Sequence, residues 1–145
     1  ILVKLTSQLK YPSFDIKLKK ENEQVYVFDL IRKNWFVCTP EEWVRQHLIN
    51  YLIEVKKYPS SLFSIEKEIV LNNLKRRFDV VVFSSNLKPL LLIECKAMYV
   101  NIDKHVAEQA MRYNLVLNAP YFMLTNGVVD FVFCNNTLVD LPEFC

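Results

Sequence analysis

The stretch that most constrains the fold is residues 77–96, RFDVVVFSSNLKPLLLIECK, because it is typical of two buried strands joined by a turn. Residues 78–83 are β-branched and aromatic apart from Asp79, and residues 90–93 are continuously apolar. Residues 84–89 hold turn-forming side chains, and Pro89 has no N–H to donate to a central sheet. These features predict an antiparallel hairpin inside a buried sheet.

The hairpin is expected to bring acidic side chains together. Asp79 lies near the start of one strand and Glu94 at the end of its partner, and alternation along the strand places Glu94 and Lys96 on one face. Two carboxylates about 4 Å apart repel by roughly 4 kcal/mol at an effective dielectric of about 20, so the pair needs a neutralising partner. Oxygen ligands favour Mg²⁺ or Mn²⁺. The alternative is that these acids are strand-end residues that pair with Arg77 and Lys96.

Composition limits the remaining choices of protein class. A chain of 145 residues with 52% hydrophobic residues predicts one folded domain rather than disorder. A single glycine leaves no room for a glycine-rich phosphate loop, which excludes P-loop and dinucleotide-binding classes. The net charge of +2 is too small to indicate nucleic-acid binding, although local basic clusters could form a patch.

The cysteines and the apolar runs bear on the cellular compartment. The four cysteines have no C-x-x-C spacing, so we expect free, mostly buried thiols in a reducing cytosol. No apolar run has the length of a membrane span, and no signal-peptide pattern is present. We therefore expect a cytoplasmic protein with no membrane partner.

The remaining segments predict an ordered series of elements. Residues 14–29 alternate as a peripheral hairpin, and residues 32–37 add a short strand. Thr39 and Pro40 predict a helix that begins near residue 40 and ends before Pro59, at about residue 57. A strand over 60–71 precedes the central hairpin, a helix over 102–118 follows it, and Asn126-Gly127 predicts a last hairpin between strands 121–125 and 128–133.

The helix faces suggest further site residues. On the first helix the predicted core stripe is Val44, Leu48, Leu52 and Val55. Glu41 lies on that stripe and could face a buried site, or it could only complement the helix dipole, whereas Glu42 is predicted to be the capping-box acid.

On the second helix the predicted inward residues are Val106, Ala107, Ala110, Met111, Tyr113 and Leu117. Gln109 and Tyr113 are four residues apart and share a face. The simpler interpretation is that Tyr113 is a core aromatic and Gln109 an exposed helix former.

The order of elements and acids resembles the PD-(D/E)xK nuclease superfamily, whose core is αβββαβ. The closer resemblance is to the N-terminal nuclease domain of the R subunit of type I restriction enzymes and to short stand-alone proteins similar to it. The stretches that carry it span most of residues 14–133: RKNWFVCTPEEWVRQHLINYLI, RRFDVVVF, KPLLLIECKA and EQAMRYNLVLNAPYFMLTNG. It implies an α/β restriction-endonuclease-like fold, with a mixed central sheet flanked by helices and an N-terminal β-hairpin. Phe78 stands where the superfamily signature has proline.

The resemblance also implies roles for individual residues. Asp79 and Glu94, with the backbone carbonyl of Cys95, would bind Mg²⁺, with Mn²⁺ as a substitute, and Lys96 would orient or deprotonate the attacking water. Glu41 resembles the helix acid of the superfamily, with Glu42 as the alternative. Gln109 and Tyr113 match its Q-x-x-x-Y motif, which lies near the scissile strand.

These features predict a magnesium-dependent deoxyribonuclease, an endonuclease of a restriction system, with DNA and other restriction-modification subunits as partners. Alternatives are a non-catalytic nucleic-acid-binding or assembly module, and an RNA- or tRNA-processing nuclease. The single domain 1–145 is divided into an N-terminal β extension (1–38), a nuclease core (39–135) and a C-terminal tail (136–145).

Overall fold

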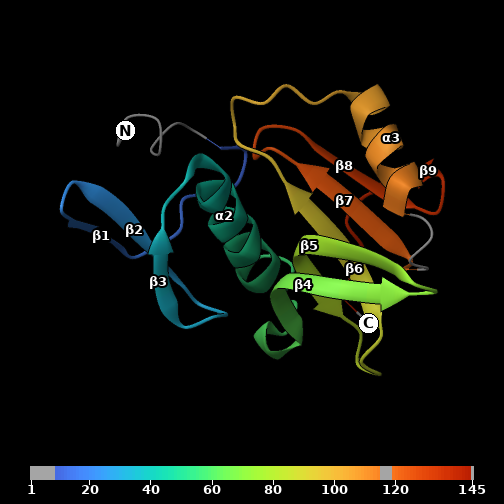
Figure 1. Cartoon of the computed structure of the whole chain (residues 1–145), viewed down its shortest axis with the longest axis horizontal. Coiled ribbons are helices and arrows are strands. Elements are labelled where there is room, and N and C mark those ends of the chain that lie inside the picture. Colours follow the sequence, from blue (N-terminus) through green and yellow to red (C-terminus); the bar gives the residue numbers. More distant parts are fainter. Residues whose placement is uncertain (1–8, 115–118, 145) are drawn as a thin grey trace.

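The computed structural model describes residues 9–114 and 119–144 as two sheets and two helices (Figure 1). The smaller sheet is antiparallel and has three strands in the order β1-β2-β3. The larger sheet has six strands in the order β4-β5-β6-β7-β8-β9, and only its β6–β7 pair is parallel. The elements are β1 (Leu18–Glu21), β2 (Gln24–Asp29), β3 (Asn34–Val37), α2 (Pro40–Glu54), the 3₁₀ turn η1 (Ser60–Leu62), β4 (Phe63–Leu71), β5 (Leu74–Phe83), β6 (Pro89–Cys95), α3 (Lys104–Asn114), β7 (Tyr121–Thr125), β8 (Asp130–Cys134) and β9 (Thr137–Leu138).

The order α2-β4-β5-β6-α3-β7 is the predicted αβββαβ series, and the mixed α/β fold with an N-terminal β unit is confirmed. Strand alternation places the helices on opposite faces of the larger sheet. Val80 and Val82 pack in the cluster that contains the α2 residues, whereas Val81 packs in the cluster that contains the α3 residues. Because both faces of the central strands are covered, these strands are almost continuously apolar.

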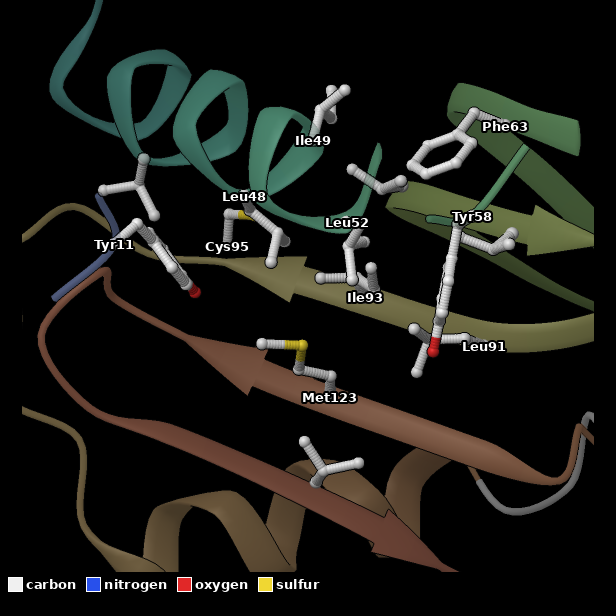
Figure 2. Close-up of a cluster of buried hydrophobic side chains, with 14 of the residues drawn as sticks. Tyr11, Leu48, Ile49, Leu52, Tyr58, Phe63, Leu91, Ile93, Cys95 and Met123 are labelled. Atoms are coloured by element: carbon white, nitrogen blue, oxygen red, sulfur yellow. The ribbon is translucent and has the colours of Figure 1, made fainter. Parts of the chain in front are cut away.

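The first cluster lies between α2 and the sheet (Figure 2). Leu48 and Leu52 point from α2 toward Ile93 and Cys95 on β6, with Met123 of β7 beyond them. Leu48, Leu52 and Ile93 are fully buried. The predicted α2 stripe is therefore correct at Val44, Leu48 and Leu52, but wrong at Val55, which is 48% exposed.

The helix α2 begins as predicted and ends earlier than predicted. Thr39 is the N-cap, and its Oγ1 accepts a hydrogen bond from the Glu42 N–H at 3.0 Å. The helix ends at Glu54 because the chain turns back to bury Tyr58, whose N–H donates to the Leu52 carbonyl at 2.9 Å. Lys57 takes a left-handed φ of 61° in that turn.

The helix α3 spans residues 104–114, so the predicted start at 102 is two residues early, and residues 115–118 with Leu117 lie outside the described residues. Its inward face is Ala107, Met111 and Asn114. The prediction that Val106 and Tyr113 point inward is wrong: they are 42% and 62% exposed.

The turn between β7 and β8 contains the single glycine of the chain. Gly127 has φ +85°, and an added Cβ would lie 2.8 Å from Leu9 Cδ2 and 3.2 Å from Val44 Cγ2. Its carbonyl accepts a hydrogen bond from the Lys10 N–H at 2.7 Å. Glycine is thus required both by the backbone conformation and by the close packing of the segment that precedes β1.

Cys38 and Cys95 are buried free thiols and Cys134 is a partly buried one, as predicted, whereas Cys145 lies outside the described residues. Within the described ranges, neither helix is long and apolar enough to cross a membrane.

Candidate functional site

The site is built on the hairpin of β5 and β6. These strands pair antiparallel with Val80 opposite Ile93, so Asp79 and Glu94 each lie one residue beyond this pair, at the same end of the hairpin. Asp79 Oδ2 also accepts a hydrogen bond from the Cys95 N–H at 2.7 Å. The prediction that the two acids lie at the same end of the hairpin is correct, because antiparallel pairing and the turn together determine the register.

Lys96 joins this pair immediately after β6. Its Nζ lies 3.8 Å from Glu94 Oε2, and its N–H donates to the Thr125 carbonyl at 2.8 Å. Glu94 and Lys96 therefore do project together, as strand alternation predicted. Of the competing interpretation, the Glu94–Lys96 pair is present, whereas Arg77 does not pair with Asp79, because its Nη2 lies 2.9 Å from Glu66 Oε2.

The two acids are destabilised as anions. Burial raises the pKa of Asp79, and the Cys95 N–H, Arg45 and Lys96 only partly oppose that rise. Burial also raises the pKa of Glu94; Lys96 lowers it and the charge of Asp79 raises it again. Both shifts follow from partial desolvation together with a nearby negative charge, that of Glu66 for Asp79 and that of Asp79 for Glu94. A bound cation would relieve both penalties.

The donor set tests whether a metal ion fits here. Asp79 and Glu94 offer hard carboxylate oxygens and remain about one-third exposed, at 35% and 34% of their side chains, so an ion could keep several waters. In the described part of the chain, however, no three His, Cys, Asp or Glu side chains gather as a metal cluster. An ion at this position would be bound by two acids, with backbone oxygen and water completing its shell.

The acids of α2 are arranged differently from the prediction. Glu41 is exposed and lies at the rim of a cavity of about 190 Å³, whereas Glu42 is buried in its wall. Only half of the predicted capping box forms, since the Glu42 N–H bonds Thr39 but the Glu42 carboxylate bonds Arg32, Arg45 and Gln46. The prediction that Glu42 serves as the capping acid is therefore wrong, and Glu41, the predicted inward-facing acid, lines the cavity from its exposed edge while Glu42 is the buried one. Ion pairs with Arg32 and Arg45 stabilise the Glu42 carboxylate in the interior.

The same cavity is lined by Asp79 and by a residue that the sequence reasoning missed, Arg45. Arg45 makes a two-pronged contact with Glu42, Nε to Oε2 at 2.9 Å and Nη2 to Oε1 at 2.5 Å. Its Nη1 lies 3.4 Å from the Asp79 carbonyl oxygen and 4.0 Å from Asp79 Oδ1. A larger cavity of about 440 Å³ lies near Tyr11 and contains none of the predicted site residues.

The signal for Arg45 was present in the sequence as a Glu42–Arg45 pair at i, i+3 on a helix. Residues at that spacing ordinarily form a pair on the surface of a helix. Local periodicity does not reveal that segments before the helix cover this pair. The pKa of Glu42 reflects its burial and its partners. Burial raises this pKa, but Arg45, Gln46 and Arg32 lower it more, so that overall it lies below its ordinary value.

The Q-x-x-x-Y residues lie on the exposed side of α3. Gln109 is exposed and its Nε2 lies 3.3 Å from His105 Nε2. The Tyr113 ring is covered by the Arg76 guanidinium, 3.9 Å from the ring centroid. The structure thus brings Asp79, Glu94 and Lys96 together and places Gln109 and Tyr113 on the exposed side of α3, where Tyr113 is not a core aromatic.

The comparisons with known proteins extend over the elements that build this site. A family model described as type I restriction enzyme R protein N terminus matches residues 40–142, well over half of the chain. A search of curated proteins found no match. The matched segment begins at the first residue of α2 and contains Asp79, Glu94, Lys96, Gln109 and Tyr113, and it leaves out β1, β2 and β3. The chain belongs to the family of type I restriction enzyme R protein N termini, which associates it with a restriction system.

Proposed function

We propose that this chain is a metal-dependent endonuclease domain of PD-(D/E)xK type that hydrolyses DNA phosphodiester bonds in a restriction system. The observation that carries the proposal is that Asp79 and Glu94 lie at the same end of the paired strands β5 and β6, with Lys96 against Glu94. Family membership supports the restriction role, with DNA and other restriction-modification subunits as partners.

The residues divide the work as follows. Asp79 and Glu94, with the Cys95 carbonyl, would hold Mg²⁺, or Mn²⁺ in its place, and the ion would polarise the phosphoryl oxygen and acidify a bound water. Lys96, 42% exposed, is placed to orient that water and to balance the developing phosphoryl charge. Glu41, at the cavity rim, is available for a contact through water, and Gln109 and Tyr113 would contact the DNA strand beside the cleavage point.

Cleavage of supercoiled plasmid with Mg²⁺ or Mn²⁺ tests the proposal. Lys96→Ala is expected to lower the rate at least about a hundredfold, because one charged group is lost from the reacting centre. Lys88→Ala, on the exposed turn between β5 and β6, is the matched control and should cleave normally. Equal rates for Lys96→Ala and the control would refute the catalytic role.

Ion binding gives a readout that does not depend on activity. Calorimetric titration with Mn²⁺ should give binding to the parent chain and none to Asp79→Asn or Glu94→Gln, while circular dichroism shows that both variants are folded. Undiminished Mn²⁺ affinity in both variants would place the ion elsewhere.

A non-catalytic nucleic-acid-binding or assembly module is the second candidate. It is favoured because, within the described residues, no three His, Cys, Asp or Glu side chains are grouped to hold an ion, and because the Cys95 N–H and Arg45 already contact Asp79. DNA or subunit binding without metal-dependent cleavage would support it, and cleavage of RNA in preference to DNA would support a processing nuclease.

A further inference from the structure

Behind the proposed metal site, buried charges alternate in sign along one connected path. The path runs from Asp29 at the end of β2 through Arg32 to Glu42 and Arg45 on α2, and it ends at Asp79 on β5. Asp29 is completely buried, and Glu42 and Arg45 are buried as well. Charges so desolvated are tolerated only when they are paired closely.

The contacts along this path are uneven. Arg32 Nε lies 2.7 Å from Asp29 Oδ2 and its Nη2 lies 2.9 Å from Glu42 Oε1. Arg45 then takes both oxygens of Glu42 at 2.5 and 2.9 Å. The last link is long, since Arg45 Nη1 is 4.0 Å from Asp79 Oδ1 and its hydrogen bond goes to the Asp79 backbone carbonyl instead.

Three acids and two arginines alternate along the path, and a fourth acid, Glu66, lies 3.6 Å from Arg45 Nη2 but is itself paired with Arg77. The long last link leaves Asp79 without a close cationic partner in the path. Gln46 strengthens the near end of the path, because its Nε2 donates to Asp29 Oδ2 at 2.9 Å and to Glu42 Oε2 at 3.0 Å. The two-pronged contact with Glu42 uses Nε and Nη2 of Arg45, so it fixes the position of the guanidinium at a distance from the Asp79 carboxylate.

We propose that Glu42 is a positioning residue that restrains Arg45, so that the Asp79 carboxylate stays available to a divalent cation. The inference rests on the proposed metal site. It gives Glu42 a role other than direct or water-mediated contact with the ion. It also assigns part of the site to Asp29 and Arg32, which precede the segment matched by the family model.

Removal of Glu42 has a defined consequence in this arrangement. In Glu42→Gln the two-pronged contact is lost, and Arg45 needs to move only from 4.0 Å to ordinary ion-pair distance to bind Asp79. Arg45 would then compete with the cation, and Mn²⁺ affinity is expected to fall at least about tenfold, the scale of changes in the residues that support metal ligands.

The double variant Glu42→Gln/Arg45→Gln discriminates between the two roles of Glu42. If Glu42 only restrains Arg45, removal of the arginine as well returns Mn²⁺ affinity to within about threefold of the parent chain. If Glu42 contacts the ion itself, affinity stays low in the double variant, and this result would overturn the proposal. Glu108→Gln, which breaks the exposed Glu108–Arg112 pair on α3, is the matched control and should leave Mn²⁺ affinity unchanged.

Two further measurements keep the test decisive. If Glu42→Gln does not fold, Arg45→Gln alone should keep the parent affinity for Mn²⁺, because Glu42 retains Arg32 and Gln46. A tenfold loss of Mn²⁺ affinity in Arg45→Gln contradicts the proposal.

If the parent chain binds no Mn²⁺, the proposed metal site fails. A crystal structure of Glu42→Gln still tests whether Glu42 restrains Arg45, because an Arg45 within about 3 Å of Asp79 Oδ1 supports the restraint. An Arg45 that remains at its present distance refutes it.

Discussion

At the scale of single residues, the site combines two carboxylates with opposite electrostatic situations. Asp79 and Glu94 are partly desolvated and only weakly compensated, so burial raises the pKa of each. Glu42 is more deeply buried, yet Arg45, Gln46 and Arg32 lower its pKa overall. The difference comes from the number of donors around each carboxylate, and it separates an acid that can receive a cation from one that is already neutralised.

The raised pKa values predict how stability depends on pH. Between its ordinary value, 3.8 for Asp79 or 4.5 for Glu94, and its higher folded value, each acid binds a proton more tightly in the folded state. The free energy of unfolding contributed by these groups therefore falls as pH rises through that interval, and the cost persists at neutral pH.

Neutral replacements should remove this cost. At pH 7 without divalent ions, Asp79→Asn and Glu94→Gln are each expected to raise Tm by about 2 °C or more, and the gain should vanish below the ordinary pKa of the acid. Differential scanning calorimetry from pH 3 to pH 7 measures it. A lower Tm for both variants at pH 7 would mean that the ionised acids stabilise the fold.

At the scale of elements, α2 joins the fold and the site. Its first two turns present Glu42 and Arg45 to the cavity, while Leu48, about one turn after Arg45, packs against the sheet (Figure 2). The buried face of α2 is wide because the charged residues on it, Glu42 and Arg45, are paired with each other, and Arg32 reaches Glu42 from the segment between β2 and β3. The start of α3 is set by Asp103, whose Oδ1 accepts from the Val106 N–H at 2.9 Å.

Truncation on α2 should separate its buried side from its exposed end. Leu48→Ala is expected to cost about 2–5 kcal/mol of unfolding free energy, because Leu48 is fully buried between α2 and β6 and leaves a cavity. Val55→Ala, at a position 48% exposed just after the helix, is the control and should cost less than about 1 kcal/mol. Urea unfolding measures both, and equal costs would contradict the packing described.

At the scale of the whole molecule, α2 lies between the three-stranded sheet and the six-stranded sheet (Figure 1). Trp43 contacts both the cluster of the larger sheet and the cluster formed by Val25, Val27 and Cys38. Asp29 and Arg32 add the polar link to Glu42. The N-terminal β unit is thus packed into the domain, although the family match begins only after it.

A shortened chain of residues 39–145 tests this integration. It loses the buried Val25, Val27 and Tyr11, each worth about 1.5–3 kcal/mol, and it leaves Glu42 and Gln46 without Arg32 and Asp29. Thermal circular dichroism is expected to show a Tm at least about 10 °C lower than that of the full chain, or no cooperative transition. A Tm within a few degrees would make the N-terminal unit an independent appendage.

The local pattern of the sequence determined the central hairpin, the start of α2 and the convergence of Asp79, Glu94 and Lys96. These features follow from strand alternation, turn residues and a capping threonine, all of which act over a few positions. The same local rules determine the order of elements that resembles a nuclease family.

The tertiary structure decided which acid of α2 is buried, where Arg45 lies and which face of α3 is exposed. Glu42 is buried because Arg32 reaches it from the segment between β2 and β3. Tyr113 is exposed to solvent, and its ring packs against the Arg76 guanidinium of β5. Such outcomes depend on charges and rings brought together from distant parts of the chain, and helical periodicity carries no information about those partners.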